Sequence, residues 1–68
     1  MGWSYKPLWR LLLERDMKKT EMQRLAGISS VVLAKMGKNQ PVTLETLGKI
    51  CKVLECRVED VIEYIPEA

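Results

Sequence analysis

Apolar residues recur along the chain at intervals of three and four, the spacing that places side chains on one face of an α-helix. The first such series is Leu8, Leu11 and Leu12. Pro7 suits the first helical turn, because its missing N–H group would have no partner there. The pattern therefore predicts a helix over residues 7–15.

A second, shorter series runs from Met22 to Ala26 and stops at Gly27. Glycine tolerates the left-handed backbone that closes a helix, so we expect this helix to end near Ala26. Its start is less well marked. Thr20 and Gln23 have the spacing of a capping box, in which each side chain satisfies a backbone N–H group of the first turn.

Two further helices each begin with a capping residue. Ser29 is a good N-cap for a third helix whose inward residues are Leu33 and Met36, and Thr43 caps a fourth. Residues 37–41 between them have the composition of a turn. The fourth helix carries a wide apolar stripe, which consists of Leu44, Leu47, Ile50, Cys51 and Leu54.

The end of the chain predicts a short fifth helix, marked by Val58, Val61 and Ile62 and ended by Pro66 at the latest. Both ends of the chain are rich in residues that favour strands, in residues 3–5 and 64–65. They would allow a two-stranded ribbon that joins the termini. The expected fold is thus all-α with five helices, in a single domain over residues 1–68.

Composition argues against catalysis and against a metal site. The chain has 68 residues, 47% of them hydrophobic, which is enough for one small core and leaves little room for a deep cleft. It contains no histidine, the commonest general base near neutral pH and the commonest metal ligand. Cys51 and Cys56 have no second pair for a zinc site, and we interpret them as reduced core residues rather than redox or metal residues. We expect no enzyme activity, no cofactor and no metal.

The charge is divided unevenly along the chain. Residues 1–40 carry a net charge of +5 and residues 41–68 carry −3, although the whole chain carries only +2. Such a chain can present a cationic face to a polyanion. A solvated surface with no partner would have the same composition.

Two short helices joined through a tight turn, the second of them capped by Ser29, have the plan of a helix-turn-helix over residues 19–37. The turn Gly27-Ile28-Ser29, the inward Leu33 and Met36, and the start of the fourth helix over residues 41–47 fall in register together. In these features the chain resembles the Cro/phage-repressor (XRE-type) family of small bacterial transcriptional regulators. The resemblance implies a compact lambda-repressor-like domain that binds double-stranded DNA with its third helix in the major groove.

The sequence departs from the family pattern at three positions. Family members commonly carry glutamine in the first turns of the second and third helices, where this chain has Lys19 and Ser30. They usually place serine or threonine at the cap of the second helix, where Lys18 stands here. The family's base code therefore does not transfer, and the second helix is expected to start weakly.

The outward face of the third helix is the candidate for reading bases. We assign this role to Ser30, Val31, Ala34 and Lys35. An exposed valine can contact the methyl group of thymine, and lysine can donate to guanine N7 and O6. Val31 or Val32 could instead pack against a neighbouring helix or a second copy, and Lys35 could contact phosphate alone.

Contacts to phosphate are expected on both sides of that face. The candidates are Lys18, Lys19, Ser29, Lys38 and Asn39. Backbone N–H groups at the start of the second helix also face anions there. Such contacts fix the register of the protein on DNA without reading its sequence.

One recognition helix reads only a few base pairs, so we expect a weak homodimer that forms or is stabilised on DNA. Trp3, Tyr5, Tyr64 and Ile65 are the expected apolar contributors, although a ribbon between the termini would use the same residues. No apolar run approaches the roughly 20 residues that span a bilayer, so no membrane partner and a cytoplasmic location are expected. The alternative function is a protein-binding antitoxin or adaptor that uses the same fold.

Overall fold

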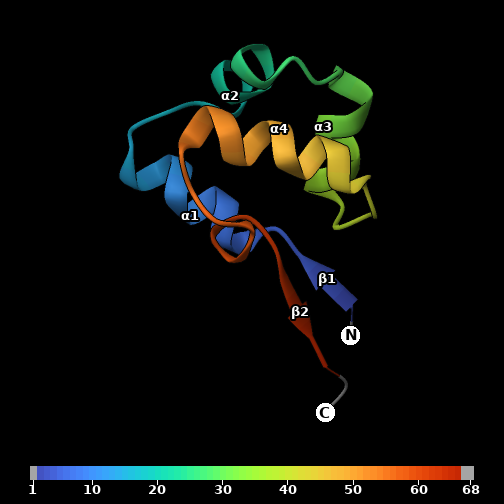
Figure 1. Cartoon of the computed structure of the whole chain (residues 1–68). Helices are drawn as coiled ribbons and strands as arrows, with labels where there is room; N and C mark the ends of the chain where they lie inside the picture. The colour runs from blue at the N-terminus through green and yellow to red at the C-terminus, as the bar shows by residue number, and fades with distance from the viewer. Residues whose placement is uncertain (1, 67–68) are drawn as a thin grey trace.

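A computed structural model describes residues 2–66 and shows four α-helices and a two-stranded antiparallel ribbon (Figure 1). The four helices and the ribbon succeed one another as β1 (Gly2–Ser4), α1 (Lys6–Glu14), α2 (Lys19–Ala26), α3 (Ser30–Gly37), α4 (Leu44–Leu54) and β2 (Glu63–Ile65). A three-residue 3₁₀ turn, η1 (Val58–Asp60), lies between α4 and β2. The ribbon projects from the end of the molecule opposite α2.

The core collects the inward faces of all four helices. Its buried residues are Tyr5, Leu8, Leu12, Met22, Ala26, Ile28, Met36, Leu47, Ile50, Leu54 and Val61. Helix α4 packs against α2, and α1 packs against η1. The predicted inward positions of α2 and α3 are confirmed at Met22 and Met36, while Leu33 is half-buried against the core.

The predicted helix ends are confirmed at three points. The Ser29 Oγ accepts a hydrogen bond from the backbone N–H of Val32 at 3.2 Å, and Thr43 Oγ1 accepts one from Thr46 at 3.2 Å. Gly27 has a left-handed backbone with φ 69°, and it ends α2. Its N–H donates to Arg24 and that of Ile28 to Gln23, which satisfies the last carbonyls of α2.

The predicted fifth helix is wrong, because the structure has only the single turn η1 in its place. Glu63 pairs with Ser4 across the ribbon, and α4 ends at Leu54. Few residues remain between these two fixed points, so the chain completes one turn before it extends into β2. Helix α1 also begins one residue earlier than predicted, at Lys6.

The prediction that Leu44 belongs to the buried stripe of α4 is also wrong, since its side chain is 82% exposed. At about 100° per residue, Leu44 lies about a quarter turn away from the line that Leu47, Ile50 and Leu54 present to the core. Leu44 therefore faces solvent at the start of α4.

The ribbon between the termini is present. Gly2, Trp3 and Ser4 pair with Ile65, Tyr64 and Glu63, respectively. The rings of Trp3 and Tyr64 meet edge to face with centroids 5.0 Å apart. The strand ends at Ser4. Tyr5 is the N-cap residue of α1 instead, and its side chain is fully buried.

Candidate nucleic-acid interface

The four predicted base-reading residues lie on one outward face of α3. Ser30, Val31, Ala34 and Lys35 are all exposed, whereas Met36 on the opposite side of the helix is fully buried. Positions one, four and five residues apart fall within an arc of about 140° on a helix, so these side chains can contact one surface together. The burial of Met36 fixes which side of α3 is outward.

The two valines at the start of α3 have different environments. Val32 is half-buried and packs against the core, whereas Val31 is 64% exposed. Packing within this chain therefore accounts for Val32 and leaves Val31 free to contact another molecule. An exposed β-branched side chain on a helix has no stabilising role of its own there.

Ser29 combines a structural role with a free donor. Its Oγ accepts from Val32 and so caps α3, while the hydroxyl proton remains available to donate to a phosphate oxygen. Backbone N–H groups of the first turn point past this residue, where the helix dipole favours an anion.

At the start of α2, the structure selects Lys18 as the N-cap position and Lys19 as the first helical residue. The capping box predicted from Thr20 and Gln23 is not formed there. Instead, the Glu21 carboxylate accepts from the backbone N–H of Lys18 at 3.2 Å. A lysine ammonium cannot accept a hydrogen bond, so Lys18 contributes no side-chain cap and keeps its charge exposed.

Lys19 lies over an aromatic ring. Its Nζ is 4.3 Å from the centroid of the Trp9 ring, which belongs to α1. This cation–π contact holds the ammonium at the N-terminus of α2. Sequence reasoning assigned Trp9 no such role, because the contact joins two helices.

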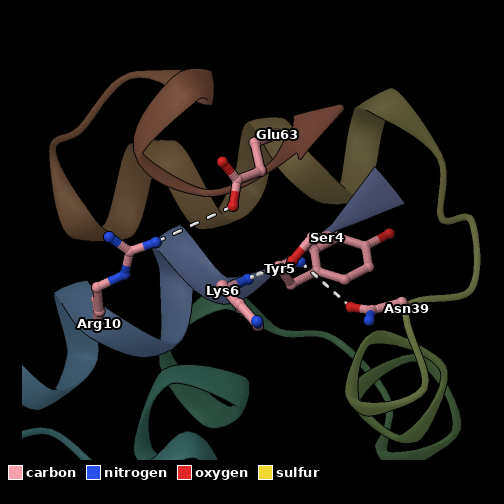
Figure 2. A network of polar contacts seen from close by, with 6 residues as sticks. All are labelled: Ser4, Tyr5, Lys6, Arg10, Asn39 and Glu63. Atoms are coloured by element: carbon pink, nitrogen blue, oxygen red, sulfur yellow. Dashed lines mark hydrogen bonds and ion pairs between the residues drawn. The ribbon is translucent and has the colours of Figure 1, made fainter. Parts of the chain in front are cut away.

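Lys38 and Asn39 follow α3 in a loop that is fixed to the N-terminal segment (Figure 2). Asn39 Oδ1 accepts from the backbone N–H of Tyr5 at 3.3 Å, and the Tyr5 hydroxyl donates to the Gln40 carbonyl at 2.8 Å. The Asn39 amide N–H groups remain available as donors toward phosphate. Asn39 also has φ 57°, a left-handed conformation that asparagine adopts more readily than most residues.

Burial raises the pKa of the Tyr5 hydroxyl above its ordinary value of 10.0, and a backbone hydrogen bond from Val42 opposes part of this effect. The hydroxyl is therefore protonated at neutral pH and can serve as the donor to Gln40. Nothing in the sequence pattern links Tyr5 to this loop, which lies 35 residues further along the chain.

Together, these nine residues form what we call the candidate DNA face: Lys18, Lys19, Ser29, Ser30, Val31, Ala34, Lys35, Lys38 and Asn39. All nine are exposed. Among residues 2–66, the ion pairs join Arg10 to Glu63 and Arg57 to Glu59. Both pairs lie outside the candidate DNA face, so its four lysines have no acidic side chain in ion-pair contact.

Arg15 has a structural role that its sequence position did not indicate. Its guanidinium donates to the carbonyl of Leu54 at the C-terminus of α4. Helix C-termini carry partial negative charge and unpaired carbonyls, so this contact stabilises the end of α4.

Cys51 and Cys56 are free thiols, both half-buried. Burial raises the pKa of the Cys56 thiol, and the neighbouring Cys51 raises it further, while Arg15 lowers it. The thiol is therefore protonated at neutral pH, the less nucleophilic form. Within residues 2–66, no three His, Cys, Asp or Glu side chains are grouped so that they could hold a metal ion, and no helix has the length and apolar character to cross a bilayer.

Comparison with known proteins gives three matches. Residues 7–67 match the family of Cro/C1-type HTH DNA-binding domains. The chain is 41% identical over 56 residues to YozG of Bacillus subtilis (strain 168), an uncharacterized HTH-type transcriptional regulator, and the match covers 79% of this chain and 67% of YozG. It is also similar to the crystal structure of the transcriptional regulator VanUg, with a TM-score of 0.93 and 47% identity over 97% of this chain and 88% of that one.

The family match covers nearly the whole chain. This confirms the resemblance inferred from the turn at Gly27, the cap at Ser29 and the inward Met36. The chain belongs to the family of Cro/C1-type helix-turn-helix DNA-binding domains.

Proposed function

We propose that this protein is a small transcriptional regulator that binds double-stranded DNA sequence-specifically, with α3 in the major groove. The observation that carries the proposal is the outward face of α3, where Ser30, Val31, Ala34 and Lys35 are all exposed beside a capped helix start. The family membership supplies the ligand class, and the exposed face supplies the element that would contact it.

Within this proposal, Lys35 and Val31 carry most of the sequence reading. Lys35 donates to guanine N7 and O6, and Val31 contacts a thymine methyl group. Ser30 and Ala34 lie to one side of them on the same face and limit how closely the helix approaches the base edges. Support comes from the 64% exposure of Val31, which no packing within this chain explains.

Phosphate contacts come from Lys18 and Lys19 at the start of α2, and from Ser29, Lys38 and Asn39 around α3. The free hydroxyl proton of Ser29 and the free amide N–H groups of Asn39 support this assignment, since each residue uses only its oxygen within the fold. Trp9 restricts where the Lys19 ammonium can lie. These contacts set the register of α3 without selecting a sequence.

Two copies bind half-sites one DNA turn, about 34 Å, apart, as a weak homodimer that forms or is stabilised on DNA. A palindromic duplex at saturation should carry two chains in sedimentation, and one chain per duplex would contradict this part. We place the protein in the cytoplasm and propose no catalytic step for it.

The proposal is tested by measuring affinity for a mixed-sequence duplex at low and moderate salt. A DNA-binding face loses affinity steeply as salt rises, because the release of counterions from DNA drives the association. The logarithm of the binding constant falls with the logarithm of the salt concentration, with a slope of about 0.9 per phosphate contact. Lys52→Ala, at an exposed position of α4 outside the candidate DNA face, is the matched control and should leave the slope unchanged. A flat salt response would instead favour the protein-binding antitoxin or adaptor.

A further inference from the structure

An apolar groove lies between the terminal ribbon and the loop that follows α3. It has a volume of about 450 Å³ and is open to solvent. Four parts of the chain line it: Trp3 and Tyr64 of the ribbon, Pro41 and Val42 of the loop after α3, Leu44 of α4 and Val58 of η1. Trp3, Tyr64 and Val58 are about half exposed, and Leu44 is almost fully exposed.

We propose that this groove is the contact surface between two copies of the chain. The inference rests on the proposed binding of two copies to DNA and names the surface through which they meet. Of the residues that the sequence suggested for such a contact, Trp3 and Tyr64 line the groove. Tyr5 is buried beneath it, and Ile65 lies on the opposite side of the ribbon from Tyr64 by strand alternation.

The exposed apolar area fits a weak dimer. The four exposed side chains together present roughly 400–500 Å², so two copies would bury on the order of 1,000 Å², near the lower limit for a specific interface. Aromatic residues dominate such contacts, and Trp3 with Tyr64 would supply them. A two-fold axis through this surface would bring the exposed Trp3 and Tyr64 of one copy against the same apolar residues of the other.

The charges around the groove fit a protein surface better than a nucleic acid. Its charged lining residues are Glu59 and Glu63, which would repel phosphates. Each has an arginine partner, with Arg57 at 3.9 Å from Glu59 and Arg10 at 4.0 Å from Glu63. These pairs reduce the repulsion between the acidic rims of two copies.

The test is sedimentation equilibrium of the full chain without DNA, from about 10 µM to about 1 mM, the range expected for an interface of this size. The wild-type average mass should rise from 7.8 kDa toward that of a dimer. Leu44→Lys should weaken association about tenfold or more, because it places a charge in the apolar contact. Val58→Lys, which changes a residue of η1 in the same lining, should act in the same direction.

Leu13→Lys is the matched control. Leu13 is 80% exposed on α1, outside the groove, so the same substitution at similar exposure should leave association unchanged. A wild-type chain that stays monomeric at the highest concentration would overturn the inference. Equal association of wild type and Leu44→Lys would overturn it as well.

A second set of measurements, with DNA, distinguishes failure of this inference from failure of the proposed function. A duplex selected from a random pool is cut to a single half-site, and Leu44→Lys should bind it as well as wild type, since the added charge is positive. On the two-half-site duplex, Leu44→Lys should lose cooperativity. Failure of every variant and of wild type to bind the half-site would contradict the proposed function, whereas unchanged cooperativity in Leu44→Lys would contradict only the groove contact.

Discussion

Tyr5 donates its hydroxyl proton to the backbone carbonyl of Gln40 at 2.8 Å, and thereby joins the start of α1 to the loop that follows α3. Asn39 in the same loop accepts from the backbone N–H of Tyr5 (Figure 2). The ring of Tyr5 is fully buried. This one residue therefore positions the C-terminal end of the candidate DNA face relative to the core.

Replacing Tyr5 with phenylalanine should keep the ring and remove the hydrogen bond to Gln40. We expect the free energy of unfolding at neutral pH to fall by about 0.5–1.5 kcal/mol, because a partly buried hydrogen bond is lost. Urea denaturation followed by circular dichroism measures the change. Tyr64→Phe is the control, since the Tyr64 side chain is exposed, and an equal loss in both variants would contradict the role of Tyr5.

Alkaline pH should destabilise the fold through the same hydroxyl. Burial raises the pKa of Tyr5 above 10.0, so the folded state holds this proton more tightly than the unfolded state does. The stabilisation is complete below pH 10 and is lost as the pH rises above it. Urea denaturation below and above pH 10 should show that the free energy of unfolding falls less with rising pH in Tyr5→Phe than in wild type. Identical pH dependence in the two proteins would rule out this linkage.

Lys35→Ala should reduce specific binding more than non-specific binding. A good contact to a guanine edge contributes about 1–3 kcal/mol of discrimination, whereas a phosphate contact contributes equally on all sequences. Affinities for a selected duplex and for a mixed-sequence duplex give the comparison. Equal losses on the two duplexes would reassign Lys35 to a phosphate contact, and Lys52→Ala should change neither affinity.

Lys19→Ala should lower the affinity for all sequences alike and reduce the salt slope by about one unit. The reason is that Lys19 stands at the start of α2, beside the Trp9 ring, and is proposed to contact phosphate. Binding to a mixed-sequence duplex over a series of salt concentrations measures the slope. An unchanged slope would remove Lys19 from the candidate DNA face.

Glu55→Gly should stabilise the protein. Glu55 ends α4 with φ 51°, a left-handed conformation that costs a residue with a side chain about 1–2 kcal/mol and glycine almost nothing. The greater freedom of glycine in the unfolded chain offsets about 0.4–1 kcal/mol, so we expect a net gain of about 0.5–1 kcal/mol. Thermal denaturation tests it against Lys52→Gly, which lies within α4 and should cost about 1 kcal/mol.

The sequence predicts those features that neighbouring residues determine. Ser29, Thr43 and Gly27 act within one turn of their own helices, and each is confirmed as a helix end. The inward positions of Met22 and Met36 follow from helical spacing alone. Local patterns therefore predict where α2 ends, where α3 and α4 begin, and which side of α2 and α3 faces the core.

The features that the sequence does not predict depend on partners far along the chain. The single turn at η1 results from the pairing of Glu63 with Ser4, which the local apolar pattern does not encode. Arg15 reaches the end of α4, 39 residues away, and Trp9 lies beneath Lys19 of another helix. Leu44 is the exception, because its exposure follows from its helical angle within α4 and not from a distant partner.

The central claim is that α3 reads base edges in the major groove, and methylation interference tests it most directly. Dimethyl sulfate modifies guanine N7 in the major groove and adenine N3 in the minor groove, and both are mapped on a duplex selected from a random pool. For wild type we predict interference at guanine N7 in two clusters about 10 base pairs apart. In Lys35→Ala the interference should be weaker at the one guanine that Lys35 contacts. Interference confined to adenine N3, or no interference at any purine of a duplex that is bound specifically, would contradict the assignment of α3 as the reading element.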